Sequence, residues 1–447
     1  MKDRRALAWL SLALLAPLAA ARDVVIVEGP AAGTYAVLQD AIDAAHSGDV
    51  LLLGPGAYSA FTIDGKGLTL AAMPGAFVSV GFASAVINLP AAEFVVLERL
   101  TTGGAMPSGA DGLTLVNNAG HVRLQGCAWR GANSFGSGGS AGGDAVSIDS
   151  CARVAFVRCS AIGGAGKHSG SAFPLGGRGG DGVRARQAVL AIHDCAMSGG
   201  HGGSNGGGGG DGLNAAQSVL FAAGSLMAGG DGGDATTSAL CEGDGGDALE
   251  LLGSEARLLD LEYERGAAGQ GAGPFGCVGV NGRTRNVSQS TVVFENGAAR
   301  ALSAPSFVRD SDPLALDVFG QALDTARLRT HRRPAWTYGA AAVGPLLVPA
   351  GQAGSLRLLG VAPSSGQLAS SVQPRPLAAG RIARVDFLQL IADDAQGARF
   401  NASPWHVVVF DDNAGPDCNG NGVPDVFDIA TGASLDLDLD GQPDECP

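Results

Sequence analysis

An internal repeat between residues 111 and 266 constrains this chain more than any other feature. Each unit opens on an aspartate that follows glycines, and it closes on a glycine 18–20 residues later. The intervals from a closing glycine to the next aspartate vary from 12 to 18 residues. A near-constant segment alternating with a variable, glycine-rich one predicts packed rungs joined by tolerant surface loops. The opening aspartates are Asp111, Asp144, Asp181, Asp211 and Asp247, and the closing glycines are Gly131, Gly163, Gly199, Gly229 and Gly266.

The constant segments carry the pattern of short β-strands. Residues 145–148, 154–157 and 258–261 are apolar with partial alternation, and Asn, Ser, Gly or Ala turns separate such runs. Helical periodicity with capping residues is absent from this stretch. The repeat therefore predicts stacked strands rather than helices.

The cysteines of the repeat share one position. Cys127, Cys159 and Cys195 each lie four residues before a closing glycine, and Ser225 takes that position in the next unit. If the rungs stack, these residues form a column with neighbours about 4.8 Å apart. We expect them to act as small buried residues, while a disulfide between successive rungs is the alternative.

Residues 22–300 resemble the right-handed parallel β-helix of the pectin-lyase-like superfamily. Residues 35–45 look like the short amphipathic helix that caps such solenoids, and residues 48–58 look like a first coil. The resemblance implies an all-β solenoid with an N-terminal cap helix. A cap is physically required because an open end of stacked strands exposes unpaired backbone groups.

The N-terminal segment and the composition predict an exported protein. Basic residues, an apolar stretch and a small-residue cleavage site make residues 1–21 a secretory signal peptide. No later segment is apolar enough to span a membrane. The formal net charge of −14 and the lack of a basic stripe weigh against nucleic acid as a partner. We therefore expect a secreted or cell-surface location.

The sequence changes character near residue 301. Glycine-rich loops give way to strand-like runs at residues 314–319, 346–348, 356–359, 385–391 and 406–410. Short strands at this spacing predict a small antiparallel β-sandwich over residues 301–411, with a structural or adhesive role.

Residues 412–447 predict a calcium-binding tail. Two runs fit D-x-[DN]-x-[DN]-G, the start of a calcium loop that offers oxygen ligands at alternate positions. The tail resembles both dockerin modules and thrombospondin type 3 repeats, and Cys418 with Cys446 is the expected disulfide. Calcium is the only cofactor expected. The first loop offers Asp417, Asn419, Asn421, the Val423 carbonyl, Asp425 and Asp428, and the second offers Asp436, Asp438, Asp440, the Gln442 carbonyl and Asp444.

Several other motifs have weaker functional interpretations. Residues 176–183 and 206–213 fit the calcium-binding β-roll pattern, but their copies lie about thirty residues apart instead of nine. Their aspartates are better explained as acceptors of backbone N–H bonds at the start of a rung. The G-H-G around His201 resembles polygalacturonases, yet we expect an exposed histidine. Arg184, Arg186 and His193 share one rung and face either a groove or solvent.

No catalytic set is assigned from the sequence. The leading hypothesis is a non-enzymatic extracellular protein that binds a polysaccharide or another surface protein. The alternative is a lyase or glycoside hydrolase that acts on acidic polysaccharide, which requires two suitably spaced carboxyl groups. A face that gathers three or more converging acidic and basic side chains favours the enzyme.

Overall fold

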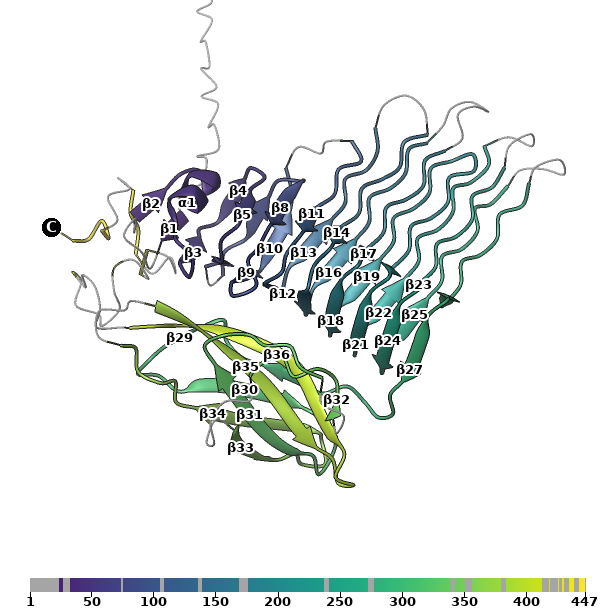
Figure 1. Cartoon of the computed structure of the whole chain (residues 1–447). Coiled ribbons are helices and arrows are strands. Elements are labelled where there is room, and N and C mark those ends of the chain that lie inside the picture. Colours follow the sequence, from purple (N-terminus) through teal and green to yellow (C-terminus); the bar gives the residue numbers. More distant parts are fainter. Residues whose placement is uncertain are drawn as a thin grey trace, which may run out of the picture.

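A computed structural model gives the fold of the chain (Figure 1). It describes residues 24–26, 33–73, 75–104, 108–135, 139–168, 176–236, 241–271, 277–338, 342–349, 356–378 and 383–411. In the tail it describes residues 418, 425, 428–429, 434–437 and 442–446. The predicted signal peptide lies outside the described residues.

The first part of the chain is a right-handed parallel β-helix, as expected. Each coil contributes one strand to each of three sheets, and successive coils pair in parallel register. Sheet A holds β1 (Val24–Ile26), β2 (Gly33–Tyr35), β3 (Val50–Leu53), β6 (Thr69–Ala72), β9 (Phe94–Glu98), β12 (His121–Gln125), β15 (Arg153–Val157), β18 (Val189–His193), β21 (Val219–Ala223), β24 (Glu255–Leu259) and β27 (Thr291–Phe294). Sheet B holds β4 (Gly56–Tyr58), β7 (Val78–Val80), β10 (Leu100–Thr102), β13 (Ala128–Arg130), β16 (Ser160–Ile162), β19 (Ala196–Ser198), β22 (Leu226–Ala228) and β25 (Glu262–Glu264). Sheet C holds β5 (Thr62–Asp64), β8 (Ser84–Ile87), β11 (Leu113–Val116), β14 (Val146–Asp149), β17 (Val183–Arg186), β20 (Leu213–Ala216), β23 (Leu249–Leu252) and β26 (Asn286–Ser288).

Two of the three corners are short and regular, and this explains the near-constant segment of the repeat. A single residue with positive φ turns the chain from sheet A to sheet B, for example Arg158 (51°) and Asp194 (54°). Ser150 (55°) and Gln187 (48°) do the same between sheets C and A. Most of the length variation therefore falls at the third corner, between sheets B and C, where the glycine-rich segments lie.

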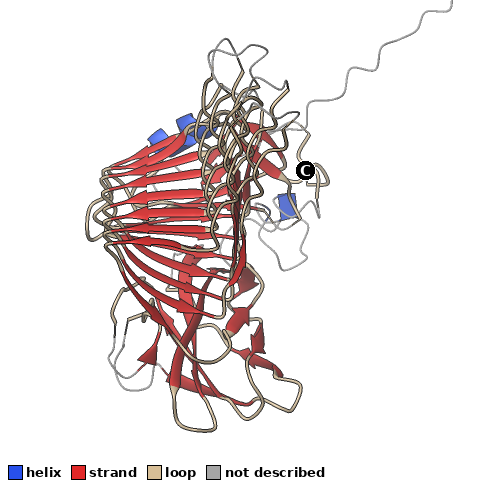
Figure 2. Ribbon diagram, turned by 90° about the vertical axis from the view of Figure 1, so that its right-hand side faces the viewer, coloured by secondary structure: helices blue, strands red, loops and turns tan. Residues whose placement is uncertain are grey.

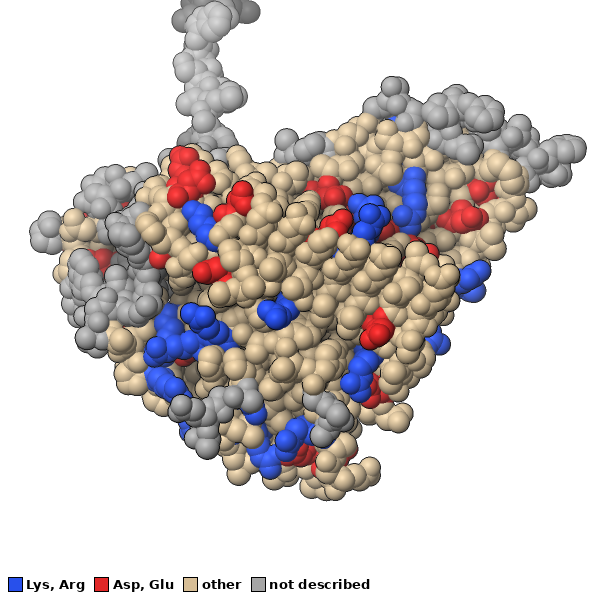
Figure 3. All heavy atoms as spheres, viewed as in Figure 1, with Lys and Arg blue, Asp and Glu red and all other residues tan. Residues whose placement is uncertain are grey.

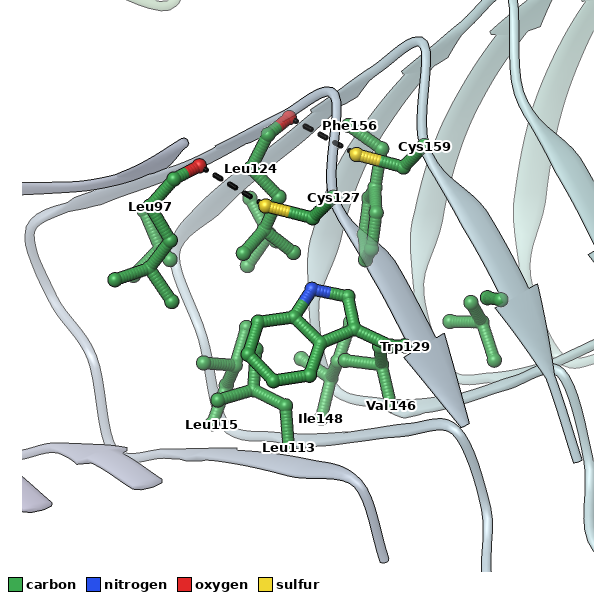
Figure 4. Close-up of a cluster of buried hydrophobic side chains, with 14 of the residues drawn as sticks. Leu97, Leu113, Leu115, Leu124, Cys127, Trp129, Val146, Ile148, Phe156 and Cys159 are labelled. Atoms are coloured by element: carbon green, nitrogen blue, oxygen red, sulfur yellow. Dashed lines mark hydrogen bonds between the residues drawn. The ribbon is translucent and has the colours of Figure 1, made fainter. Parts of the chain in front are cut away.

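The interior of the solenoid is a continuous apolar core. Alternate residues of each strand point inward and stack on their equivalents in the next coil, with Trp129 and Phe156 fully buried. Cys127, Cys159 and Cys195 are buried free thiols in this stack. Figure 4 shows Cys127 and Cys159 each directing sulfur to a carbonyl oxygen of the preceding coil, at 3.3 Å. The expectation of small buried residues is confirmed.

The N-terminal end of the solenoid is closed by helix α1 (Leu38–Ala44), which lies within the predicted cap segment. Leu38, Ala41 and Ile42 bury one face of the helix on the first coil. The Gln39 side chain accepts the Thr62 N–H and donates to the Thr62 carbonyl, so it satisfies backbone groups at the edge of β5. This is the capping that an open sheet edge requires.

The second part is a β-sandwich. One sheet holds three antiparallel strands, β28 (Ala301–Ser303), β30 (Leu314–Phe319) and β34 (Gln367–Val372). The other holds β29 (Phe307–Arg309), β31 (Thr325–His331), β32 (Ala342–Val343), β33 (Leu356–Val361), β35 (Ala383–Asp393) and β36 (Arg399–Phe410). Two pairs in this larger sheet, β29–β36 and β32–β36, are parallel. The predicted strand at residues 346–348 is not formed; Leu346 makes only an isolated bridge to Thr337.

The sandwich packs its larger sheet against the outer face of sheet A (Figures 1 and 2). Phe94 of β9 meets Phe387 of β35 edge to face, with ring centroids 5.2 Å apart. Arg123 of β12 donates to the Trp405 carbonyl at 3.1 Å. Both faces of β35 and β36 are therefore buried.

Candidate functional site

The glycine-rich segments form two packed layers. One layer leaves sheet B and the other returns to sheet C, and the two run side by side outside the solenoid (Figures 1 and 2). We call this the glycine double layer. Its outgoing segments are residues 131–135, 163–168, 199–205, 229–236 and 265–271, and its returning segments are residues 139–145, 176–182, 206–212, 241–248 and 277–285. The prediction of tolerant surface loops is wrong for these residues.

Close approach of backbone explains the glycines. A Cβ built on Gly199 would lie 1.9 Å from the carbonyl oxygen of Gly210 in the facing layer, and one on Gly163 would lie 1.9 Å from that of Gly180. A side chain at either position would therefore clash with the facing backbone, although the φ angle itself would allow one. The pattern is Gly-Gly-X with a three-residue period, as in residues 199–204 and 229–234. Three residues per turn is the period of the polyproline II helix, in which glycine is the residue that fits where chains crowd together.

The backbone N–H groups of a triplet have three different kinds of partner. In the outgoing layer, the N–H of the first glycine donates to the carbonyl of an X residue in the next coil, as Gly202 does to Asp231 at 2.8 Å. The second donates across to the other layer, as Gly200 does to Gly180 at 2.8 Å. The N–H of the third residue, X, donates to neither of these backbone carbonyls and needs another acceptor.

Where the preceding coil has an Asp or Asn at the third position, its side chain accepts that third N–H. Asp181 Oδ1 accepts from Asp211 N–H at 2.9 Å, and Asp211 Oδ1 accepts from Asp247 N–H at 2.8 Å. Asn133, Asp231, Asp234 and Asp244 do the same elsewhere in the two layers. The repeated aspartates therefore complete the backbone hydrogen bonding, as the alternative to a β-roll calcium site predicted.

The X residues of the returning layer continue into sheet C at the same three-residue spacing. This places polar side chains from successive coils in adjoining rows at the foot of the double layer, where Figure 3 shows basic and acidic atoms mixed. We call these residues the polar strip, and it is the candidate functional site. It comprises Asp144, Arg178, Asp181, Arg184, Asp211, Asn214, Asp247, Glu250, Arg283 and Asn286.

Side-chain contacts link the coils across the strip. Arg184 pairs with Asp144 at 2.5 Å, and Arg178 pairs with Asp181 at 3.0 Å and Asp211 at 2.7 Å. Asn214 donates to Asp211 at 3.1 Å and to Glu250 at 2.5 Å. The Arg178 and Arg184 side chains are 47% and 53% exposed, whereas Asp144, Asp181 and Asp211 are buried beneath them. The strip therefore shows guanidinium groups to solvent and keeps its aspartates below.

Burial raises the pKa of several of these carboxyl groups. The pKa of Asp144 rises to about 7, chiefly through burial and secondarily through nearby Asp181, while Arg184 opposes the rise. The pKa of Glu250 also rises to about 7, through partial burial and then the charge of Asp211. Burial raises the pKa of Asp181 as well, against the opposing charge of Arg178. The strip therefore loses negative charge as the pH falls through neutrality.

The arginines and histidines singled out in the sequence do not lie together in the structure. Arg184 and Arg186 project outward from sheet C, whereas His193 ends β18 on sheet A and is buried against Phe221 beneath the sandwich. His201 is exposed, as expected, with its Nδ1 3.6 Å from Asp231 Oδ2. The interpretation of Arg184, Arg186 and His193 as one group is therefore wrong.

The strip meets part of the criterion for an enzyme, because acidic and basic side chains gather on one face. However, one oxygen of each ladder aspartate is held by a backbone N–H, and the other oxygen of Asp211 is held by Arg178 and Asn214. Outside the tail, no three His, Cys, Asp or Glu side chains in the described ranges lie close enough together to hold a metal ion.

The tail residues that the structure describes include five of the predicted calcium ligands. Asp425 is buried; its Oδ1 accepts the Cys418 N–H at 2.9 Å, and its Oδ2 is buried with no hydrogen-bond partner. An orphaned buried carboxylate oxygen fits a cation ligand. Asp428 is also buried, and Asp444 Oδ1 accepts the Leu437 N–H at 2.9 Å. Asp436 and Gln442 are described too, while Asp417, Asn419, Asn421, Val423, Asp438 and Asp440 lie outside the described residues.

Two disulfides are present among the described cysteines. Cys418–Cys446 closes the tail, which confirms the expected pairing. Cys241–Cys277 joins the last two returning segments of the double layer and was not predicted. Both agree with an oxidising compartment.

Comparisons with known proteins leave the chain without a family. No family model matches it, and no curated protein does. One solved structure that it resembles is the receptor-binding protein of bacteriophage Det7, a podoviral tailspike in a myovirus. That similarity has 10% identity over 83% of this chain and 96% of that chain, with a TM-score of 0.16, and carries no functional argument. No described helix is long and apolar enough to cross a membrane.

Proposed function

We propose that this chain is an exported, non-enzymatic β-helix protein that binds an extended polysaccharide along the polar strip. The observation that carries the proposal is the layering of charge in the strip. Exposed Arg178 and Arg184 lie above aspartates that each hold a backbone N–H on one oxygen and pair with a guanidinium group. Such a surface offers donors to a ligand but has few uncommitted carboxylates for acid–base chemistry.

The strip runs along the solenoid axis across successive coils, so it repeats at the spacing of parallel strands, about 4.8 Å. A linear polymer can contact several coils at once, and each contact then adds to the same binding event. Guanidinium groups bind carboxylates in a bidentate manner. We therefore expect acidic polysaccharides to bind more tightly than neutral ones.

The test is retention of the full-length protein on immobilised polygalacturonate, alginate and dextran, combined with an assay for released reducing ends. We expect retention on the acidic polymers and no cleavage. Arg178→Ala with Arg184→Ala should abolish retention, whereas Arg357→Ala on the exposed edge of the sandwich should not. Release of reducing ends that is lost in the Asp211→Asn variant would instead support the glycoside hydrolase alternative.

We further propose that the tail binds calcium and that the ion has a structural role. Asp425, Asp428, Asp436, Asp444 and the Gln442 carbonyl are the described groups that would hold it, together with the predicted ligands outside the described residues. Calorimetric titration with CaCl2 should show binding that Asp425→Asn weakens and that Asp317→Asn, on exposed β30, leaves unchanged. Unaltered titration of the Asp425→Asn protein would contradict the assignment.

A further inference from the structure

The last coil of the solenoid concentrates exposed apolar side chains. Sixteen large hydrophobic residues are exposed in the described chain, and six of them lie between residues 252 and 294. Val278 and Val280 are 80% and 66% exposed on the last returning segment of the double layer. Scattered apolar residues need no explanation, but a group at one end of a solenoid does. Leu252 ends β23 of the preceding coil, and the other five, Val278, Val280, Val287, Val293 and Phe294, lie on the last coil.

The same coil carries three unpaired strand edges. β25, β26 and β27 are the last strands of sheets B, C and A, and Figure 1 shows no other described element beyond them. Arg285 lies over the rings of Tyr263 and Phe294, at 5.5 Å and 4.6 Å from their centroids. This end therefore differs from the N-terminal end, which α1 and the Gln39 side chain close.

The ladder of acceptors stops at this coil. In the preceding coil, Asp231, Asp234, Asp244 and Asp247 each accept a backbone N–H from the coil that follows. The equivalent positions of the last coil are Ala267, Gln270, Val280 and Arg283, which include no carboxylate or asparagine. The last coil therefore offers no Asp or Asn acceptor to a further coil, and α1 closes the opposite end of the solenoid.

We propose that the described residues of the last coil, 262–271 and 277–294, form a docking surface for the same coil of a second copy of this chain. A two-fold axis through the middle of β27 and the corner between sheets B and C pairs β27 with its own copy in antiparallel orientation. It also sets β25 against β26 of the second copy. Such an isologous contact closes as a dimer.

Charge complementarity supports this arrangement. The axis passes through the B–C corner, where β25 ends at Glu264 and the returning segment enters β26 through Arg283 and Arg285. Glu264 of one copy therefore faces the arginines of the other, and the contact occurs twice. The apolar Val278 and Val280 meet the small outgoing residues Ala267 and Ala268 at the same corner. The 28 described residues of this coil are of the number found on one side of a standard interface, about 20–30 residues.

The test is the mass of the full-length protein in solution, measured by light scattering after size exclusion. We expect twice the chain mass of 44.4 kDa, less any signal peptide. Val278→Asp with Val280→Asp should give a monomer whose far-UV circular dichroism matches that of the wild type, because both side chains are exposed. Leu358→Asp with Val361→Asp, equally exposed on the edge strand β33, is the matched control and should remain dimeric.

Charge reversal at Glu264 and Arg283 tests the proposed dimer contact independently. Glu264→Arg alone should give a monomer, and Glu264→Arg combined with Arg283→Glu should restore the dimer, because the reversed pair is again complementary across the axis. A wild-type monomer at 100 μM overturns the proposal. So does a dimer that persists in the Val278→Asp, Val280→Asp protein, or one that the paired charge reversal fails to restore.

Discussion

Glu98 Oε2 lies 2.9 Å from Nε2 of His406, a residue 308 positions later in the chain, and neither side chain is exposed. Glu98 belongs to the outer face of sheet A, and His406 belongs to β36 of the sandwich. Gln125 accepts the His406 N–H at 3.1 Å and so extends the contact to the next coil. The two parts of the molecule therefore meet through buried polar groups as well as through apolar packing.

Removing one member of this pair should be costly. Glu98→Ala leaves the buried Nε2 of His406 without its partner, and an unsatisfied buried polar group costs about 1–3 kcal/mol. Glu98→Leu with His406→Leu removes both polar groups, so the thermal midpoint of this double variant should be closer to that of the wild type. Thermal midpoints of the three proteins provide the measurement, and equal losses in the single and double variants would contradict the prediction.

Acidification should weaken the contact between solenoid and sandwich. Burial, with a smaller contribution from Arg123, lowers the pKa of His193 from 6.5 to about 3. Burial, with Arg153 and Arg123, likewise lowers the pKa of His121 to about 3. The unfolded chain therefore binds more protons below pH 6.5, and stability is lost as the pH falls from 6.5 towards 3. At pH 4.5 the loss from His193 alone is about 3 kcal/mol, since one pKa unit equals about 1.4 kcal/mol.

His193→Gln tests this assignment. The variant should lose less stability than the wild type between pH 7 and pH 4.5 in denaturant titrations. His201→Gln, at an exposed position of the double layer, should follow the wild-type curve. Parallel pH dependence in the wild type and the His193→Gln protein would rule the assignment out.

The double layer should tolerate a methyl group at some glycines and not at others. Gly199→Ala places a Cβ against the Gly210 carbonyl, whereas Gly208→Ala meets only the Asp244 carbonyl at 3.6 Å. We expect the first to destabilise by at least the 1–3 kcal/mol typical of overpacking. Gly208→Ala should change the free energy of unfolding by no more than about 0.5 kcal/mol, as ordinary surface substitutions do. Hydrogen exchange of the neighbouring amides would locate the effect, and similar exchange in both variants would refute the space argument.

The ladder aspartates should tolerate asparagine better than alanine. Asp211→Asn keeps an oxygen for the Asp247 N–H, as Asn133 and Asn205 already do in the outgoing layer, and loses only the contacts with Arg178 and Asn214 at its other oxygen. Asp211→Ala leaves that N–H without its acceptor, which costs about 1–3 kcal/mol. The measurement is the thermal midpoint, with Asp317→Ala on exposed β30 as the control. A melting curve for Asp211→Ala that matches the control would exclude this role.

The solenoid could be predicted because its signals are local. The strands at residues 145–148 and 154–157 carry alternating apolar residues, and the aspartate-to-glycine interval reports two corners of fixed length. The double layer was missed because glycine-rich runs usually indicate loops, although the Gly-Gly-X period in residues 229–234 was readable. Contacts between the solenoid and the sandwich could not be predicted from local sequence patterns. His193 reads as an ordinary polar end of a strand, and only the sandwich, supplied more than a hundred residues later, buries it.

The hydrogen bonding of the double layer also bears on how such a chain changes length. A coil such as residues 211–246 carries the side-chain acceptor for its successor and receives one from its predecessor. A tandem duplication of that segment would therefore arrive with its backbone partners already supplied. The third-position residues of the last coil, Ala267, Gln270, Val280 and Arg283, include no Asp or Asn, so a copy inserted after them would receive no such acceptor. A duplicated coil is therefore better supplied with hydrogen-bond partners after residue 246 than after the last coil.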